Sequence, residues 1–218
     1  MKKYFALSGS FMALFLLMIL IVKTVDVAPI GAEGTEIGLA SINGAVHEFF
    51  GVHIFYKKLT DLMAAGSIGI VALFAFVGLF QWIRRKSLFR VDHEILSLGG
   101  IYVLLFGFYL LFEKTIVNYR PIVMPGEVQV EASFPSSHTM LFCVITGCAI
   151  VILKKYVKNL TLRRVLYVIC WVTMPIAVLC RLASGVHWFS DILGGVLISL
   201  ALIFLYAGLT LIDRKSNP

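Results

Sequence analysis

Six long apolar runs occupy most of this 218-residue chain, and they restrict its fold more than any other feature. A helix needs about 20 apolar residues to cross the hydrocarbon core of a bilayer, with a range of roughly 17–25. The fourth and fifth runs are the shortest of the six. The runs lie at about residues 5–25, 62–83, 95–112, 137–153, 165–180 and 189–212. The sequence therefore predicts an all-α integral membrane protein with six transmembrane helices.

The composition excludes an ordinary soluble domain, because 60% of the residues are hydrophobic and 14% are charged. Soluble domains have roughly 45–50% apolar and about 25% charged residues. The apolar runs leave no room for a second domain, so we expect one membrane-embedded domain over residues 1–218. The net charge of +7 comes from basic residues that flank the runs without forming a continuous stripe. The expected partner is therefore the lipid bilayer and not nucleic acid, and no obligate protein partner is evident.

The distribution of Lys and Arg predicts the orientation. Segments on the side of the N-terminus hold 13 of these cations, Arg214 and Lys215 among them, and the opposite side holds 6. By the positive-inside rule, both termini face the cytoplasm of a multi-pass plasma membrane protein. The longest outer loop is then 26–61. Apolar residues at near-helical spacing within 37–56 predict one or two interfacial helices there.

Three polar segments lie where apolar runs meet short loops, at residues 114–121, 135–138 and 181–191. The first follows the third run, the second opens the fourth, and the last joins the fifth to the sixth. An orientation assigned from charge alone places all three at the outer face of the membrane. We therefore expect their side chains to form one site that handles an anion.

His187 and Asp191 lie four residues apart at the start of the last run, so their side chains share one helix face. A carboxylate that accepts a hydrogen bond from one imidazole nitrogen leaves the other nitrogen as a nucleophile or base. Taken alone, such a pair can also be a structural anchor of a helix end.

Residues 135–138 read Pro-Ser-Ser-His and open the fourth run. Ser136 is a plausible N-cap, so the amides around Ser136 and Ser137 would point outward at a helix terminus that binds phosphate. His138, in the first turn, could protonate a leaving oxygen. Arg181 could hold phosphate oxygens through two parallel hydrogen bonds. The alternatives are an ordinary serine cap and interfacial side chains that reach the lipid headgroups.

Lys114 and Arg120 add two cations beyond the third run, before Pro121. Both would face the same side of the membrane as Arg181 and could bind the same anion. Simple flanking of a helix end by basic residues is the alternative for this pair.

The three segments together resemble the motifs of the type 2 phosphatidic acid phosphatase and vanadium haloperoxidase superfamily. Its membrane members carry KxxxxxxRP, PSGH and SRxxxxxHxxxD in this order, within six spans. The resemblance covers roughly residues 62–212 and looks most similar to the small bacterial phosphatidylglycerophosphate phosphatases of the B type. Ser137 replaces the motif glycine, and Cys180 replaces the motif serine.

The first motif departs more seriously, because five residues separate Lys114 from Arg120 where the superfamily has six. Glu113 therefore occupies the strict lysine position. One residue turns a helix by about 100°, and the long Lys114 side chain would have to compensate for that turn.

The resemblance implies a lipid phosphatase that uses neither metal nor other cofactor. His187 would attack phosphorus to give a phosphohistidine, Asp191 would orient it, and His138 would protonate the leaving group. The implied phosphate-binding residues are Lys114, Arg120, Ser136, Ser137 and Arg181. The implied substrates are phosphatidylglycerophosphate, phosphatidic acid or a polyprenyl pyrophosphate such as undecaprenyl pyrophosphate.

Two other functions fit parts of the pattern. A haloperoxidase would hold vanadate in the same pocket, but the membrane spans and the lack of a soluble helical bundle argue against it. A non-catalytic lipid or anion binder, or a transporter, would not require His138, His187 and Asp191 together. A lipid phosphatase uses all of these groups.

Overall fold

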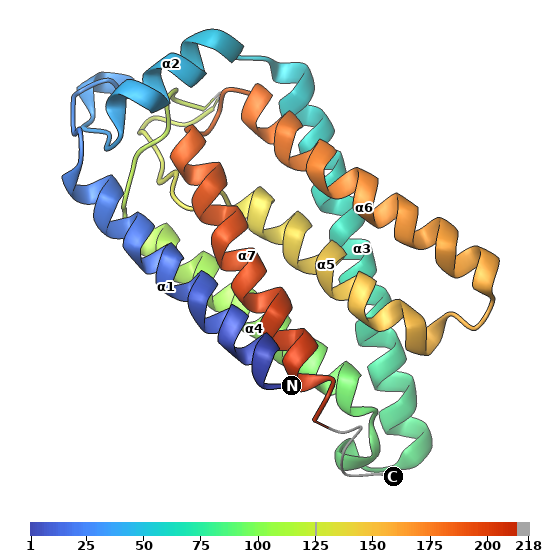
Figure 1. Ribbon diagram of the computed structural model, residues 1–218. Coiled ribbons are helices and arrows are strands. Elements are labelled where there is room, and N and C mark those ends of the chain that lie inside the picture. The colour runs from blue at the N-terminus through green and yellow to red at the C-terminus, as the bar shows by residue number, and fades with distance from the viewer. Residues whose placement is uncertain (125, 213–218) are drawn as a thin grey trace.

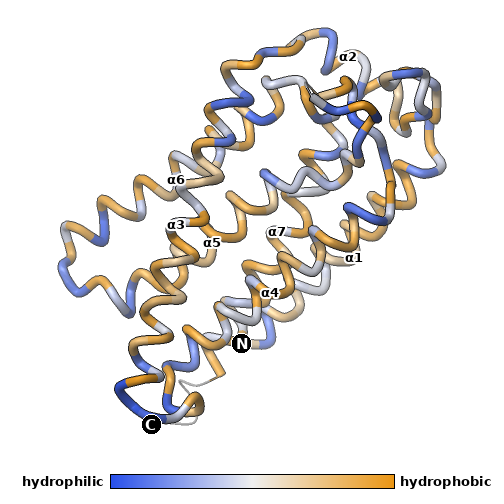
Figure 2. Tube along the Cα trace, turned by 180° about the vertical axis from the view of Figure 1, so that it is seen from behind, coloured by the Kyte–Doolittle hydropathy of each residue, from blue (hydrophilic) through white to orange (hydrophobic). Residues whose placement is uncertain are grey.

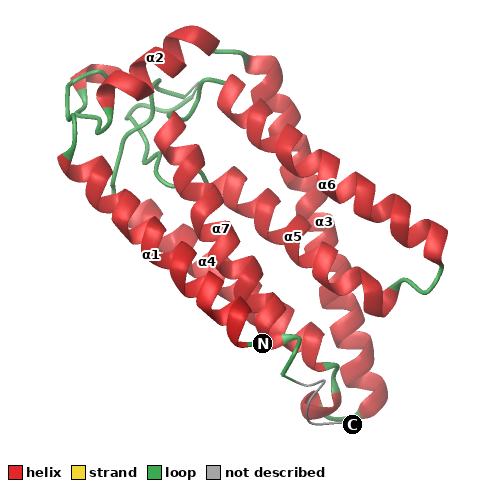
Figure 3. Cartoon of the chain, in the orientation of Figure 1, coloured by secondary structure: helices red, strands yellow, loops and turns green. Residues whose placement is uncertain are grey.

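The computed structural model describes residues 1–124 and 126–212, and over these residues it is a helical bundle (Figures 1 and 3). Six of its helices are long and apolar enough to cross a membrane, which confirms the predicted fold class. They are α1 (Lys2–Thr24), α3 (Ile54–Arg85), α4 (His93–Lys114), α5 (Ser137–Tyr156), α6 (Leu160–Ala183) and α7 (Phe189–Leu209). Arg214 and Lys215, which entered the charge comparison, lie outside the described residues.

The segment between α1 and α3 contains the expected extra helix, α2 (Ala40–Phe50), and a short 3₁₀ turn, Ala32–Gly34. α2 lies across one end of the bundle (Figure 1) and is hydrogen-bonded to the start of α7. The side-chain Nδ2 atom of Asn43 donates to Ser190 Oγ at 2.9 Å, and the backbone amide of Ser190 donates to Asn43 Oδ1 at 3.0 Å. α2 therefore supports the beginning of α7 as well as covering that end of the bundle.

α3 begins eight residues before the predicted boundary at residue 62, and this is the largest difference from the expected spans. The sequence suggested a loop as far as residue 61, because charged residues interrupt the apolar pattern there. In the structure these residues form the first two turns of α3, and they continue the helix toward the polar end of the bundle.

α5 and α7 form the centre of the bundle. Within their most apolar stretches 56% of the residues are buried, against 11% in α3 and α6. Figure 2 shows apolar residues along the long helices and hydrophilic residues mainly near the two ends of the bundle. The exposed apolar surface of α3 and α6 is expected of helices that face lipid.

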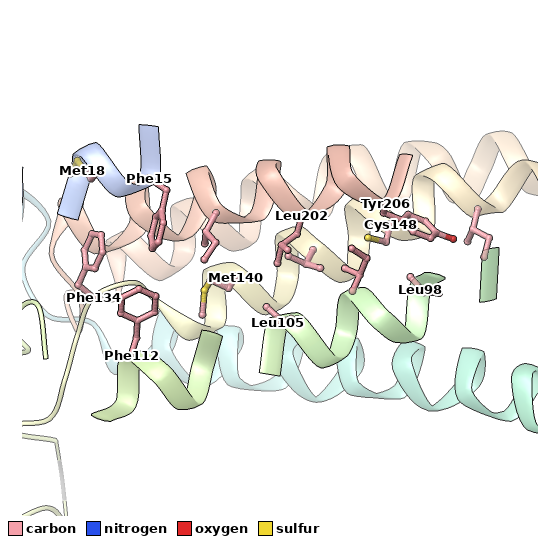
Figure 4. Close-up of a cluster of buried hydrophobic side chains, with 14 of the residues drawn as sticks. Phe15, Met18, Leu98, Leu105, Phe112, Phe134, Met140, Cys148, Leu202 and Tyr206 are labelled. Atoms are coloured by element: carbon pink, nitrogen blue, oxygen red, sulfur yellow. The ribbon is translucent and has the colours of Figure 1, made fainter. Parts of the chain in front are cut away.

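The buried core runs along the bundle between α1, α4, α5 and α7 (Figure 4). At one end of this core, the ring of Phe134 stacks on Phe15 with centroids 5.9 Å apart (Figure 4). Phe112 meets Phe15 edge-on at 5.6 Å and Phe134 at 6.4 Å. Phe134 precedes the Pro135 segment directly, so this aromatic cluster anchors the segment to the core.

Two glycines let α7 approach the N-terminus of α5. A Cβ atom on Gly194 would lie 2.5 Å from the Phe134 ring, and one on Gly195 would lie 3.0 Å from Thr139 Cβ and 3.1 Å from the Ser136 carbonyl oxygen. Small residues permit such close helix packing in membrane proteins. The approach brings the third polar segment beside the second.

The three polar segments meet at the end of the bundle that α2 covers (Figure 1). The start of α1, the connection from α3 to α4 and the connection from α5 to α6 lie at the opposite end. The structure thus brings all three segments to one face, as the charge distribution predicted.

Candidate active site

The connection between α4 and α5 folds back on itself and places Ser133 under the α6–α7 connection. The Arg120 amide donates to the Glu131 carbonyl at 3.1 Å, and the Ser133 amide donates to the Asn118 carbonyl at 2.9 Å. Tyr119 and Ala132 form an isolated antiparallel bridge between them. These bonds hold the first segment beside the residues that lead into the second.

His187 lies in the α6–α7 connection and is almost completely buried. Its Nε2 atom is 3.2 Å from Arg181 Nη2, and its Nδ1 atom is 3.1 Å from the Ser133 carbonyl oxygen. A guanidinium can only donate and a carbonyl can only accept, so this arrangement assigns the proton to Nδ1. The lone pair of Nε2 therefore faces Arg181, in the form that a nucleophile requires.

Asp191 lies in the first turn of α7, and its Oδ2 atom is 3.6 Å from His187 Nδ1. This distance is longer than a direct hydrogen bond. Ser133 connects the two groups, because its hydroxyl donates to Asp191 Oδ2 and lies 3.2 Å from His187 Nδ1. The Trp188 amide also donates to Oδ2, at 2.8 Å. His187 and Asp191 therefore lie side by side, but Ser133, which the sequence reasoning did not select, links them in place of a direct hydrogen bond.

The pKa of His187 lies well below its ordinary value of 6.5. Burial is the first cause, and the positive charges of Arg181 and Arg120 add to it, because each disfavours the protonated imidazole. The neutral form of His187 consequently prevails at neutral pH.

Arg181, in the last turn of α6, is buried and faces α3. Its Nη1 atom donates to Thr60 Oγ1 at 3.2 Å and is 3.6 Å from Asp61 Oδ1. The same Asp61 oxygen is 3.1 Å from His138 Nε2. The first two turns of α3 thus join a site whose other residues come from the three polar segments.

Ser136 is the N-cap of α5, as predicted, and its Oγ accepts from the Thr139 amide at 3.4 Å. Its own amide donates to the Asp191 carbonyl at 3.0 Å, so it is not free for an anion. Over the described residues no hydrogen bond is donated by the amides of Ser137 and His138. These two amides remain available at the helix terminus.

Arg120 and His187 line one small polar pocket of ≈ 30 Å³ together with Ser133, Ser137 and Glu113. Arg120 is mostly buried, and its Nε atom is 2.9 Å from Glu131 Oε2. Lys114 is exposed and is absent from the lining of this pocket.

The structure therefore places Glu113, and not Lys114, in the wall of this pocket. Glu113 takes the position in the pocket wall that the motif gives to lysine, and the next residue is turned away by about 100° around α4.

A larger apolar groove of ≈ 440 Å³ adjoins the polar pocket and lies between α3, α4 and α5. Both cavities are lined by Tyr109, Ser137 and Met140, and His138 lines the groove. Aliphatic side chains such as Ile68, Val71, Leu105 and Ile145 supply the rest of its surface. The arrangement can accept a molecule with an anionic head and an apolar tail.

The described residues contain no group of three or more His, Cys, Asp or Glu side chains placed to hold a metal ion. Within the site, positive charge comes from Arg120, Arg181 and the α5 terminus. These groups could neutralise an oxyanion.

Comparison with known proteins agrees with this geometry. A family model described as the PAP2 superfamily matches residues 108–212, a range that includes all three polar segments. Residues 108–212 are thus similar to a PAP2 superfamily domain. This confirms the resemblance found in the motifs.

Phosphatidylglycerophosphatase B of Bacillus subtilis (strain 168) is 30% identical over 115 residues. That match covers 50% of this chain and 57% of the relative, so the chain spans little more than half of the relative's length. A crystal structure described as the first transmembrane PAP2 type phosphatidylglycerolphosphate phosphatase from Bacillus subtilis has a TM-score of 0.60 and 21% identity. It matches over 96% of both chains, and this likeness supports the multi-pass membrane fold.

Sequence reasoning missed Ser133, Thr60 and Asp61. Ser133 lies two residues before Pro135, and nothing in its spacing distinguishes it from other loop serines. Asp61 offered a weak signal, because it is a carboxylate next to an apolar run, where an unpaired charge is costly.

Proposed function

We propose that this protein is a metal-independent lipid phosphate phosphatase of the plasma membrane. The observation that carries the proposal is the junction of the two cavities. A cationic pocket with a neutral histidine opens beside an apolar groove between membrane-spanning helices, and Ser137 lines both. A lipid phosphate has a matching structure, with an anionic headgroup for the pocket and an apolar tail for the groove.

In the proposed reaction, His187 Nε2 attacks phosphorus and a P–N bond forms. The P–O bond to the lipid breaks, and its oxygen takes a proton from His138. Water then attacks the phosphohistidine, the P–N bond breaks, and His138 accepts the water proton as the general base.

Charge stabilisation in this mechanism comes from the chain itself. Arg120, Arg181 and the free amides of Ser137 and His138 would surround the equatorial oxygens of phosphorus. Asp191 and Ser133 keep the proton of His187 on Nδ1, so Nε2 stays nucleophilic. Ser136 holds the α5 terminus in place, and Lys114 has no part in this scheme.

The proposed substrates are phosphatidylglycerophosphate, phosphatidic acid and undecaprenyl pyrophosphate. Each presents a terminal phosphate on an apolar tail. With the termini in the cytoplasm, as the positive-inside rule predicts, the site would face the extracytoplasmic side.

The test is phosphate release by purified protein from these three lipids in mixed micelles. Glycerol 3-phosphate, which has the phosphate but no tail, is the matched soluble control. We expect turnover of at least one lipid, little turnover of the control, and no change with EDTA.

Acid-labile radiolabel on the protein after incubation with a ³²P-labelled lipid would reveal the phosphohistidine. Lipid binding without phosphate release would instead favour a non-catalytic lipid binder. Loss of activity with EDTA and recovery with Mg²⁺ would contradict the metal-independent mechanism.

A further inference from the structure

A carboxylate from outside the three motif segments lies between two of their side chains. Asp61, in the second turn of α3, has its Oδ1 atom 3.1 Å from His138 Nε2 and 3.6 Å from Arg181 Nη1. Its Oδ2 atom accepts from Lys57 Nζ at 2.8 Å, one helical turn earlier. One oxygen is therefore held by its own helix, and the other contacts both motif side chains.

We propose that Asp61 is a positioning residue for the reaction, which orients His138 as a general acid and favours its protonated form. The inference rests on the proposed function for its activity measurements. It concerns a residue of α3, a helix that carries none of the motif residues.

Asp61 is placed to fix the orientation of the His138 ring. With Nε2 facing Asp61, the Nδ1 atom of His138 is left for the leaving oxygen. The lysine bond limits the rotation of the Asp61 side chain, since an i, i+4 pair on a helix keeps the carboxylate against its own helix face. The His138 ring is then held at the point where the polar pocket meets the apolar groove.

Asp61 also brings a negative charge close to His138. A protonated His138 would share the site with Arg181, Arg120 and Lys57, all positively charged, and with the imidazole of His187. Repulsion among these cations disfavours the imidazolium, and the nearby carboxylate of Asp61 opposes that repulsion. Asp61 would therefore make protonation of His138 easier than it is without this carboxylate.

The step balances without transfer to Asp61. His138 gives its Nδ1 proton to the departing lipid oxygen and becomes neutral, while Nε2–H stays bonded to the carboxylate. In the second half of the reaction, Nδ1 recovers a proton from the attacking water.

The same helix, α3, also positions Arg181. Thr60 accepts from its Nη1 atom at 3.2 Å and itself donates to the Lys57 carbonyl at 2.8 Å. Two consecutive residues of α3 thus hold the guanidinium beside His187.

The test is Asp61→Asn, which removes the charge and keeps the shape. The matched control is Glu48→Gln, the same change on an exposed side chain of α2. For a lipid phosphomonoester we expect kcat to fall about 10- to 100-fold, part of the ~10²–10⁴-fold that a general acid contributes, with KM changed less than about threefold. For p-nitrophenyl phosphate, whose leaving group needs little protonation, we expect a loss below about threefold.

A double-mutant cycle with His138→Ala separates positioning from a general structural role. If Asp61 acts through His138, adding Asp61→Asn to His138→Ala should cost less than about threefold more. Independent, multiplying losses, or equal losses for both leaving groups, would overturn the proposal. Unchanged kcat with tighter substrate binding would show that Asp61 merely occupies the anion site.

A measurement without turnover keeps the inference separate from the proposed function. In protein labelled with ¹⁵N-histidine, Asp61→Asn should shift the His138 Nε2 resonance, and Glu48→Gln should leave it unchanged. Unchanged His138 resonances would overturn the positioning role even if the protein released no phosphate. Shifted resonances in a protein without turnover would support the contact and contradict the phosphatase proposal alone.

Discussion

α7 and α3 supply the candidate site in different ways. α7 is central, with 56% of its apolar stretch buried, and its first turn holds Asp191 through bonds to Ser133 and the Trp188 amide. α3 is peripheral, with 11% of its apolar stretch buried, yet its first two turns place Asp61 between His138 and Arg181. The central helix contains motif residues, whereas the peripheral helix contributes Asp61, which belongs to none of the three motif segments.

The difference shows that a residue can contribute to a site even when it is not deeply buried and belongs to no motif segment. Around α7, close packing through Gly194 and Gly195 leaves the first turn little freedom to move. At the start of α3, a half-exposed carboxylate is positioned by a lysine on the same helix. We therefore expect substitutions near α7 to cost more activity than substitutions on α3.

The largest expected effect tests the α7 side of the comparison. His187→Ala should lower kcat for lipid phosphates by more than ~1000-fold, because the attacking nitrogen is removed. Phosphate release and circular dichroism together would check this, with the exposed His53→Ala as the control. A rate near that of the unaltered protein would show that His187 is not the nucleophile. It would also contradict the expectation that substitutions near α7 cost more activity than substitutions on α3.

His138→Ala should have the next largest effect, about 10²–10⁴-fold for a lipid alkoxide leaving group. The loss should be much smaller for p-nitrophenyl phosphate, since that leaving group departs without a proton. Comparing kcat for the two substrates provides the measurement. Equal losses would argue that His138 binds phosphate and does not protonate, and α3 would then have no acid to position.

The pH profile sharpens the comparison at His187. The pKa of this group is depressed by burial and by nearby cations, so the reactive neutral form persists as pH falls below 6.5. The acid limb of kcat/KM should therefore lie below pH 6.5.

Arg120→Gln removes one of those cations, so the pKa of His187 should rise and the acid limb should move to higher pH. Arg84→Gln, an exposed cation at the opposite end of the bundle, is the control. An acid limb that stays in place would show that Arg120 does not act on the charge of His187.

The smallest effects are expected at the end of α4. Lys114→Ala should change kcat/KM by less than about twofold, because its side chain lies outside the pocket, and exposed charges interact weakly. Glu113→Lys should lower KM about two- to fivefold, since it replaces a repulsive charge in the pocket wall and restores the motif spacing. A large loss for Lys114→Ala would instead return Lys114 to the phosphate site.

The sequence by itself determined the six spans, the single polar face and most of the site. The length of an apolar run predicts a transmembrane helix, because lipid offers no hydrogen-bond partner to the backbone and a helix pairs its own N–H and C=O groups. The motif residues His138, Arg181, His187 and Asp191 lie at the helix ends where the spans place them.

Only the tertiary structure decided which other residues join them. The charged start of α3 looked like a loop because hydropathy measures burial in lipid, and this part of the helix extends beyond its most apolar stretch. Asp61 and Ser133 meet their partners across 77 and 58 residues of sequence, respectively, and local spacing carries no information on such contacts. The choice between Glu113 and Lys114 depended on the rotation of α4 about its axis, which packing against neighbouring helices sets.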